Sequence, residues 1–278
     1  RTIRSKGGPY GGRSWSRPGH VWSRPGHVWS RPGHVPRSIR IPCFLVDKQS
    51  HLEFRQAAAG KNPVSDPYLA RMQRIHGIWG LAQLGVDFKI LPLLKDRDSE
   101  IRAQVAKVLG NPDNQWAEKP LEGLLQDPSP RVQYFAAMSL GKLGPGSATP
   151  LIVLLEKNAD EDRWIRHAAS FALSKRATSR GLASLQSHPS KSVRMGSILA
   201  LRHQNSPLLK SFLNDPNSLV AAEAARAIYD TDIAAALPAL AEGMRRFQNS
   251  TQLVLGPKKL DPAHIRRAIH AANRVGGT

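Results

Sequence analysis

Arginine and aspartate recur along this chain at positions that share one spacing. The arginines are Arg74, Arg102, Arg166 and Arg194, extended by Arg266, and the aspartates are Asp96, Asp127, Asp160 and Asp215. A row of guanidinium groups could bind phosphates or carboxylates. Carboxylates at a helix N-terminus could instead accept hydrogen bonds from its free amide groups. The elements that carry the two sets decide between these uses.

Each arginine belongs to a motif that returns about every 30 residues. The motif is an aliphatic residue, often an Arg after it, a run of small residues, and Leu or Ile eight positions on. It runs over 101–109, 132–140, 165–173, 193–201 and 220–228, with a degenerate copy at 73–81. A period of this size is typical of a solenoid built from stacked supersecondary units.

Each unit is predicted to be a pair of helices, with the motif on the second. Within the motif, aliphatic residues at i, i+4 and i+8 such as Ile101, Val105 and Leu109 predict a buried stripe between small residues that allow close packing. The stripe is interpreted as core and not as a ligand pocket. The predicted first helices are Lys89–Leu94, Trp116–Leu125, Thr149–Leu155, Ser179–Leu185, Ser206–Leu213 and Ile233–Arg245.

The four aspartates each lie five residues before the aliphatic residue that opens a motif. This position is the turn before the second helix, where a carboxylate can cap free amide groups and complement the helix dipole, worth about 1 kcal/mol. Identical placement in successive units favours this structural role, because a single active site would not repeat itself.

Two interpretations of the arginines stay open. Arg74, Arg102, Arg166 and Arg194 could line up on one surface as a ladder that binds phosphate or carboxylate. Alternatively, each could pair with the turn aspartate of its own or the adjacent unit and fix the stacking. The period shared by arginines and aspartates favours the second interpretation.

Other residues give no sign of catalysis in this segment. The histidines His76, His167, His203, His264 and His270 lack metal-site spacing, and Trp79, Trp116 and Trp164 are interpreted as packing residues. No phosphate loop, nucleophile elbow or carboxylate pair is evident. We therefore expect no catalytic, cofactor-binding or metal-binding residue here.

The N-terminal part has a different composition. Residues 15–35 are three copies of WSRPGHV, whose Pro-Gly steps break helices, so residues 1–51 are predicted to be a disordered basic tail. The net charge is +19, and residues 1–62 supply +10 of it. Cys43 is the only cysteine, which excludes an intrachain disulfide, a thiolate zinc cluster and a CxxCH haem attachment.

The motifs resemble HEAT repeats of the bilin-lyase-like kind, in LLKDRDSEIRAQVAKVLGN, LLQDPSPRVQYFAAMSLGKLG and LNDPNSLVAAEAARAIYD. Read in order from ARMQRIHGIWGLAQLG to IRRAIHAANRVGG, residues 60–277 resemble the HEAT region of secreted, membrane-bound dehydrogenases of planctomycete type. Those proteins join a sorbosone-dehydrogenase-like propeller to HEAT repeats and a c-type cytochrome. The resemblance implies a periplasmic or cell-envelope protein whose haem c and quinone cofactor would lie on other domains.

The sequence thus predicts an all-α, right-handed α-solenoid of HEAT-like helical hairpins, with six to seven units over 52–278. We expect a non-catalytic scaffold that docks a protein or a neighbouring domain of the same chain, as a fragment of a larger dehydrogenase/cytochrome protein. The alternatives are a basic HEAT-like nucleic-acid-binding protein and an enzyme similar to DNA glycosylases. Residues 246–263 interrupt the period and are predicted to be a loop.

Overall fold

The computed structural model describes residues 48–62, 64–85, 87–248 and 262–276. In this part of the chain every regular element is a helix. The predictions for residues 1–47, and for most of the loop at 246–263, lie outside the described residues. Where these predicted segments reach described residues, the chain is helical. The first helix begins at Lys48, inside the predicted tail, and the predicted loop overlaps the end of the eleventh α-helix at Gln248 and the start of the twelfth at Pro262.

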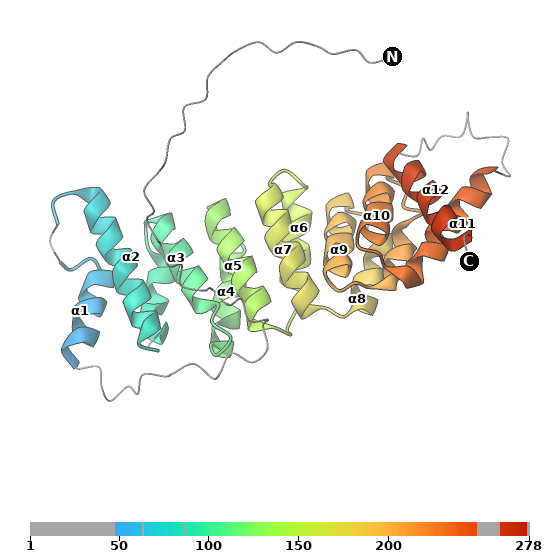
Figure 1. The fold of residues 1–278 in the computed structure, drawn as a ribbon. Helices are drawn as coiled ribbons and strands as arrows, with labels where there is room; N and C mark the ends of the chain where they lie inside the picture. The colour runs from blue at the N-terminus through green and yellow to red at the C-terminus, as the bar shows by residue number, and fades with distance from the viewer. Residues whose placement is uncertain (1–47, 63, 86, 249–261, 277–278) are drawn as a thin grey trace, which may run out of the picture. The chain divides into compact units, whose positions relative to one another are not determined.

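The helices alternate between first and second members of pairs (Figure 1). The first helices are α1 (Lys48–Ala58), the 3₁₀ helix η1 (Asp87–Lys95), α4 (Glu118–Leu124), α6 (Thr149–Asn158), α8 (Ser179–Ser184), the 3₁₀ helix η4 (Pro207–Phe212) and α11 (Leu237–Gln248). The second helices are α2 (Pro67–Gln83), α3 (Ser99–Leu109), α5 (Pro130–Leu143), α7 (Arg163–Arg176), α9 (Lys191–His203), α10 (Ser218–Asp230) and α12 (Pro262–Gly276).

Each second helix packs on its own first helix and on the second helix of the next pair. We call each pair a layer. The described residues therefore form a stack of layers, as expected for a HEAT-like solenoid. The prediction of an all-α solenoid is confirmed.

Three of the first helices differ in helix type from the sequence prediction. The segments predicted as Lys89–Leu94 and Ser206–Leu213 form 3₁₀ helices, and the predicted helix Trp116–Leu125 begins with the 3₁₀ turn η2 (Gln115–Ala117). Pro92 lies inside η1 and Pro207 is the first residue of η4. Because proline donates no amide hydrogen and its ring clashes with the preceding turn, Pro92 disfavours a continued α-helix in η1. Pro207 does not distinguish the two helix types, because proline is common at the first position of α-helices, as in α2 and α5.

The recurring aliphatic positions form the core. Ile101, Val105 and Leu109 have no exposed surface, and in α7 the equivalent Ile165 and Leu173 are 5% and 0% exposed. Each fully buried side chain of this kind contributes about 1.5–3 kcal/mol. The stripe is thus the apolar contact between layers, as the spacing predicts.

Close packing in the first layer depends on Gly77 in the middle of α2. A Cβ atom at this position would lie 2.4 Å from the backbone nitrogen of Ala58 and 2.8 Å from the carbonyl oxygen of Phe54, both in α1. The missing side chain therefore lets the two helix backbones touch.

Among the described helices, none is long and apolar enough to cross a membrane.

Candidate functional site

The ladder arginines bind the turn aspartate of the following layer at three positions. Arg102 on α3 donates from Nε and Nη2 to the carboxylate of Asp127, at 2.7 and 2.8 Å. Arg194 on α9 binds Asp215 in the same two-pronged way, at 2.7 and 3.1 Å. Arg74 on α2 pairs with Asp96. These guanidinium groups are therefore used for contacts between layers.

The same guanidinium groups also hold the turn of their own layer. Nη1 of Arg102 donates to the carbonyl oxygen of Asp96 at 2.8 Å, and Nη1 of Arg194 donates to that of His188 at 2.8 Å. Each arginine thus joins two successive turns. Since its donors are distributed between a carboxylate and carbonyl groups, few remain for an outside anion.

The turn aspartates bind the amide of the N-cap residue and not the amides of the helix itself. The carboxylates of Asp96, Asp127 and Asp215 accept the amide hydrogen of the residue two positions on, at 2.8–2.9 Å. That residue is the N-cap itself, so the prediction that these aspartates cap the helix directly is wrong. The helix amides are capped by other side chains in the same turns, those of Asp98, Asp162 and Asn217. The aspartates order the turn, and the N-cap residue two positions on caps the helix through its side chain at Asp98 and Asn217 but not at Ser129.

The ladder is interrupted in the middle of the stack. In α5 the arginine position holds Gln133, which binds the carbonyl oxygen of Asp127 at 2.7 Å and has no guanidinium to offer Asp160. In the turn before α9 the aspartate position holds His188, whose Nδ1 accepts the amide hydrogen of Ser190 at 3.1 Å. Arg166 and Asp160 pair with each other inside one layer, at 3.3 Å. Because the arginine position holds Gln133 and the aspartate position holds His188, two ion pairs between layers are missing at this point. Arg166 and Asp160, which would have formed them, pair with each other.

Burial and pairing set the charge state of the ladder. Burial favours the neutral acid of Asp127, but hydrogen bonds from Arg102 and from the amide of Ser129 outweigh it, so its pKa lies below the ordinary value. Asp96 shows the same balance, with a lowered pKa because bonds from Arg74 and the Asp98 amide exceed the effect of burial. The pKa of Arg102 is raised by its bond to Asp127. Both partners therefore stay ionised at neutral pH.

Sequence reasoning missed a second set of contacts between layers. Arg176, at the end of α7, is 7% exposed and pairs with Glu118. It also donates to the carbonyl oxygens of Leu140, Gly144 and Ser147 in the preceding layer, at 3.1–3.2 Å. Gln204 lies at the same distance from its motif and donates to the carbonyl oxygens of Ser174 and Ala177 at 2.9 and 2.8 Å. This shared offset of 11 residues was the available signal.

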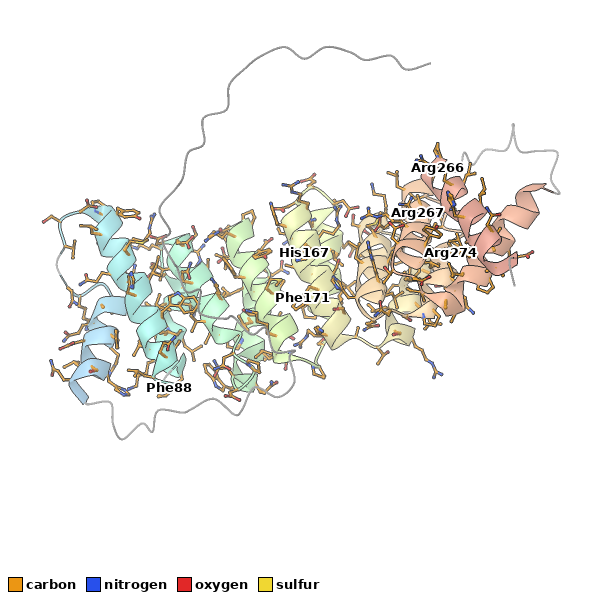
Figure 2. All side chains as sticks on the ribbon, viewed as in Figure 1. Phe88, His167, Phe171, Arg266, Arg267 and Arg274 are labelled. Carbon is orange, nitrogen blue, oxygen red and sulfur yellow. The ribbon has the colours of Figure 1, made fainter. Side chains whose placement is uncertain are left out.

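Arg266 does not extend the ladder. It is exposed on α12, and the neighbouring Arg267 makes the ion pair to α10, with Asp230, at 3.0 and 3.2 Å (Figure 2). Asp230 has a lowered pKa, chiefly because of this hydrogen bond. Within the described residues, no group of three His, Cys, Asp or Glu side chains could hold a metal ion.

The second helices carry a side on which cations lie over aromatic rings. Lys107 lies 5.1 Å from the ring centre of Trp79 and 5.5 Å from that of Phe135. Further along, Lys175 lies 5.9 Å from the ring of Phe171, which meets His203 edge to face. His167 and Phe171 lie one turn apart on α7 (Figure 2). We call the side marked by these residues the second-helix face.

The tryptophans differ from one another in exposure. Trp79 packs against the core as predicted and donates to Gln104 at 3.1 Å, while part of its surface remains exposed. Trp116 and Trp164 are 45% and 59% exposed, so the prediction that they pack is wrong. Trp116 lies in the 3₁₀ turn η2, and Trp164 lies in the first turn of α7 with the guanidinium of Arg163 5.0 Å from its ring centre.

A family model described as HEAT repeats matches residues 89–174. These residues form a HEAT-repeat region. They hold the Arg102–Asp127 contact and the interrupted step between Gln133 and Asp160, so the ladder lies partly in the matched region. No curated protein sequence matches the chain.

Among solved structures, human deoxyhypusine hydroxylase in complex with glycerol is similar to the chain. The two are 17% identical over 83% of this chain and 98% of that chain, with a TM-score of 0.30. At that score the likeness supports no conclusion about activity.

Proposed function

We propose that the layers of residues 48–276 act as a non-catalytic scaffold that docks a protein, or a neighbouring domain of the same chain, on the second-helix face. One observation carries the proposal: the aromatic rings of Trp79, Phe135 and Phe171 are partly exposed, and each has a cation over it. Aromatic side chains are enriched at protein interfaces, where they provide large, rigid contact areas.

The ladder supports this proposal because its arginines hold the layers together and are not available to bind a partner. Arg102 and Arg194 are committed to aspartates of the next layer. They keep successive second helices in register, and a rigid support allows residues on different layers to act as one surface. In this proposal the ladder fixes the positions of the second helices, and the second-helix face contacts the partner.

Photo-crosslinking tests the choice of face. A photoreactive amino acid replaces Phe171 in one variant and Val153, which is 42% exposed on the first helix α6, in a matched control. We expect the variant at 171 to give a discrete crosslinked protein or domain and the control to give none. The purified partner should then bind Phe171→Ala on the order of tenfold more weakly. Equal crosslinking at both positions would contradict the proposal.

We also propose, from the resemblance to planctomycete-type dehydrogenases, that the scaffold lies between an electron-donating and an electron-accepting domain of an exported protein. In that arrangement haem c and a quinone cofactor belong to the other domains. The coding sequence on both sides of this segment tests the idea directly. A propeller on one side and a CxxCH motif on the other would support it, and a continuous unrelated reading frame would refute it.

Nucleic-acid binding is the second candidate, favoured by the net charge of +19 and by the cation–aromatic pairs. It predicts that the affinity for single-stranded nucleic acid falls steeply with salt, by about 0.7 log units per log unit of salt for each phosphate contacted. A docking scaffold predicts weak binding that disappears at physiological salt. A titration at several salt concentrations separates the two.

A further inference from the structure

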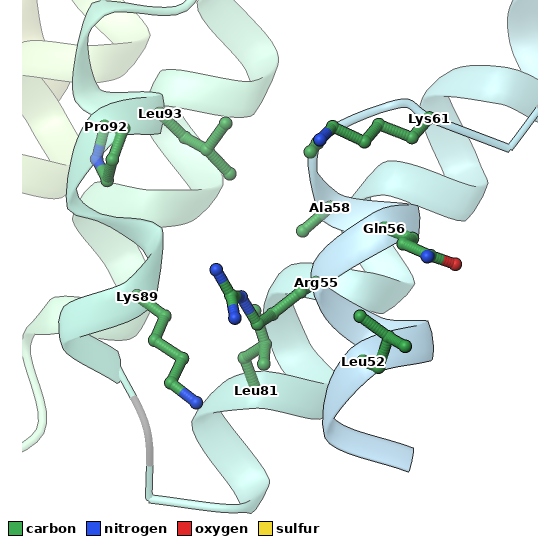
Figure 3. Close-up of a pocket in the computed structure, with 10 residues that line it drawn as sticks. Leu52, Arg55, Gln56, Ala58, Lys61, Leu81, Lys89, Pro92 and Leu93 are labelled. Carbon is green, nitrogen blue, oxygen red and sulfur yellow. The ribbon is translucent and has the colours of Figure 1, made fainter. Parts of the chain in front are cut away.

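A cleft opens between the first helices of the first two layers. It has a volume of about 270 Å³ and lies between α1 and η1, with Leu81 of α2 at its base (Figure 3). Its apolar lining includes Leu52 and Ala58 from α1 and Leu93 from η1. The volume is just below the range of about 300–1,000 Å³ for small-molecule sites, which suits one or two side chains of a peptide better than a large cofactor.

Three cationic side chains border this apolar base. They are Arg55 at the end of α1, Lys61 after it, and Lys89 in η1. Figure 3 shows all three extending toward the same space. Arg55 and Lys61 are exposed, Lys89 is intermediate, and none of the three pairs with a carboxylate among the described residues. In this they differ from Arg74 on α2, which is bound to Asp96.

We propose that this cleft binds an acidic peptide segment of a partner protein, with an aliphatic side chain on Leu81 and carboxylates beside Arg55, Lys61 and Lys89. Three cations around an apolar base, none of them paired with a carboxylate of the described residues, are complementary to alternating acidic and aliphatic residues. Lys89 also lies 5.8 Å from the ring centre of Phe88, which leaves its charge available to a carboxylate. The site is separate from the second-helix face and does not depend on the function proposed above.

Charge also argues against two other occupants of the cleft, the N-terminal part of this chain and a second copy of the chain. Residues 1–47 of this chain, which precede the cleft, hold nine Lys or Arg and one Asp, a net +8, and a second copy of the chain carries +19. Either would bring further positive charge to a cluster of cations, which costs free energy. An acidic partner removes that repulsion as well as covering the exposed Leu52, which is 45% exposed.

A random heptapeptide library displayed on phage, selected on the full chain, tests the proposal. We expect the enriched peptides to combine Asp or Glu with Leu or Ile. One enriched peptide, labelled with a fluorophore, is then titrated by anisotropy against variants. The double variant Arg55→Glu/Lys89→Glu should weaken binding by about tenfold or more, because it reverses two of the three charges.

A matched control keeps the test specific. Arg180→Glu/Lys210→Glu makes the same change in net charge on the exposed surfaces of α8 and η4 and should leave affinity within about twofold. Leu52→Ser should weaken binding, whereas Leu219→Ser, at a residue 57% exposed on α10, should not. Circular dichroism checks that each variant is folded.

Several results would overturn the proposal. Equal weakening by the two double variants would show that only net charge matters. Enriched peptides without acidic residues would exclude the stated chemistry. Dimerisation that Arg55→Glu/Lys89→Glu abolishes, or binding to phosphatidylglycerol vesicles in place of peptides, would assign the cleft to another occupant.

Discussion

Arg166 and Asp160 form an ion pair inside one layer, 3.3 Å apart, although three other ladder arginines bind the aspartate of the next layer. The reason is the identity of two other residues. Gln133 stands where an arginine would reach Asp160, and His188 stands where an aspartate would receive Arg166. The middle of the stack is therefore the place where the ladder can be completed by substitution.

Replacing His188 by Asp should stabilise the protein. An aspartate can still accept the amide hydrogen of Ser190, and it lies 22 residues after Arg166, the same separation as between Arg74 and Asp96. We expect the free energy of unfolding, from urea titration, to rise by about 1 kcal/mol. The gain should vanish when Arg166→Gln is also present. An equal gain with and without Arg166 would show that the new pair does not form.

The buried Arg176 should be far more sensitive to substitution than an exposed arginine nearby. Its side chain is 1% exposed and donates to carbonyl groups of the preceding layer as well as to Glu118. Arg176→Met leaves those carbonyls without a donor and should cost about 3 kcal/mol in the free energy of unfolding. Arg180→Met, at an exposed residue of the next helix, should change it by less than about 0.5 kcal/mol. Similar costs at both positions would contradict this account.

Two glycine substitutions should act in opposite directions. Gly77→Ala places a methyl group 2.4 Å from the backbone of α1 and should lower the free energy of unfolding by about 1–3 kcal/mol. Gly123→Ala, inside α4 where the new Cβ would meet no other element within 4 Å, should raise it by about 0.5–1 kcal/mol. Thermal and urea unfolding measure both. Stabilisation by Gly77→Ala would mean that α1 and α2 pack less closely than described.

Stability should depend on pH through the ladder carboxylates. The pKa of Asp127 is lowered in the folded protein from an ordinary value of 3.8, so its contribution is present above that value and is lost as the pH falls toward the folded pKa. We expect wild type to exceed Asp127→Asn in free energy of unfolding at pH 7, and the difference to shrink below about pH 4. A difference that stays constant down to pH 2 would exclude the ion pair as its source.

Much of the fold followed from the sequence because its signals are local and repeated. The spacing of Ile101, Val105 and Leu109 predicts a buried helical stripe, and all three are fully buried. The common period of arginines and aspartates predicts their pairing, and the structure shows which layer each arginine chooses. That choice depends on single substitutions such as His188, which a repeated pattern does not reveal.

The parts of the structure that the sequence did not predict depend on non-local geometry. Arg176 binds carbonyl groups 29–36 residues earlier, and no periodic signal marks the carbonyls themselves. The 3₁₀ helix η1 holds Pro92 in its interior and packs on α3, and the 3₁₀ helix η4 packs on α10, contacts that the local pattern does not reveal. The cleft at Arg55 and Lys89 joins residues of different layers, so it becomes visible only once α1 and η1 are placed.

A double-mutant cycle on Arg102 and Asp127 tests most directly whether the ladder holds the layers together. Unfolding free energies are measured for wild type, Arg102→Met, Asp127→Asn and the double variant, and binding to a single-stranded oligonucleotide is measured for each. The side chains of Arg102 and Asp127 are 13% and 6% exposed, so removing one leaves the other charge largely buried. We predict that each single variant loses about 2–4 kcal/mol and that the coupling energy is about 1–3 kcal/mol, with no specific loss of oligonucleotide affinity. Unchanged stability and zero coupling, together with weaker oligonucleotide binding in Arg102→Met, would contradict the account.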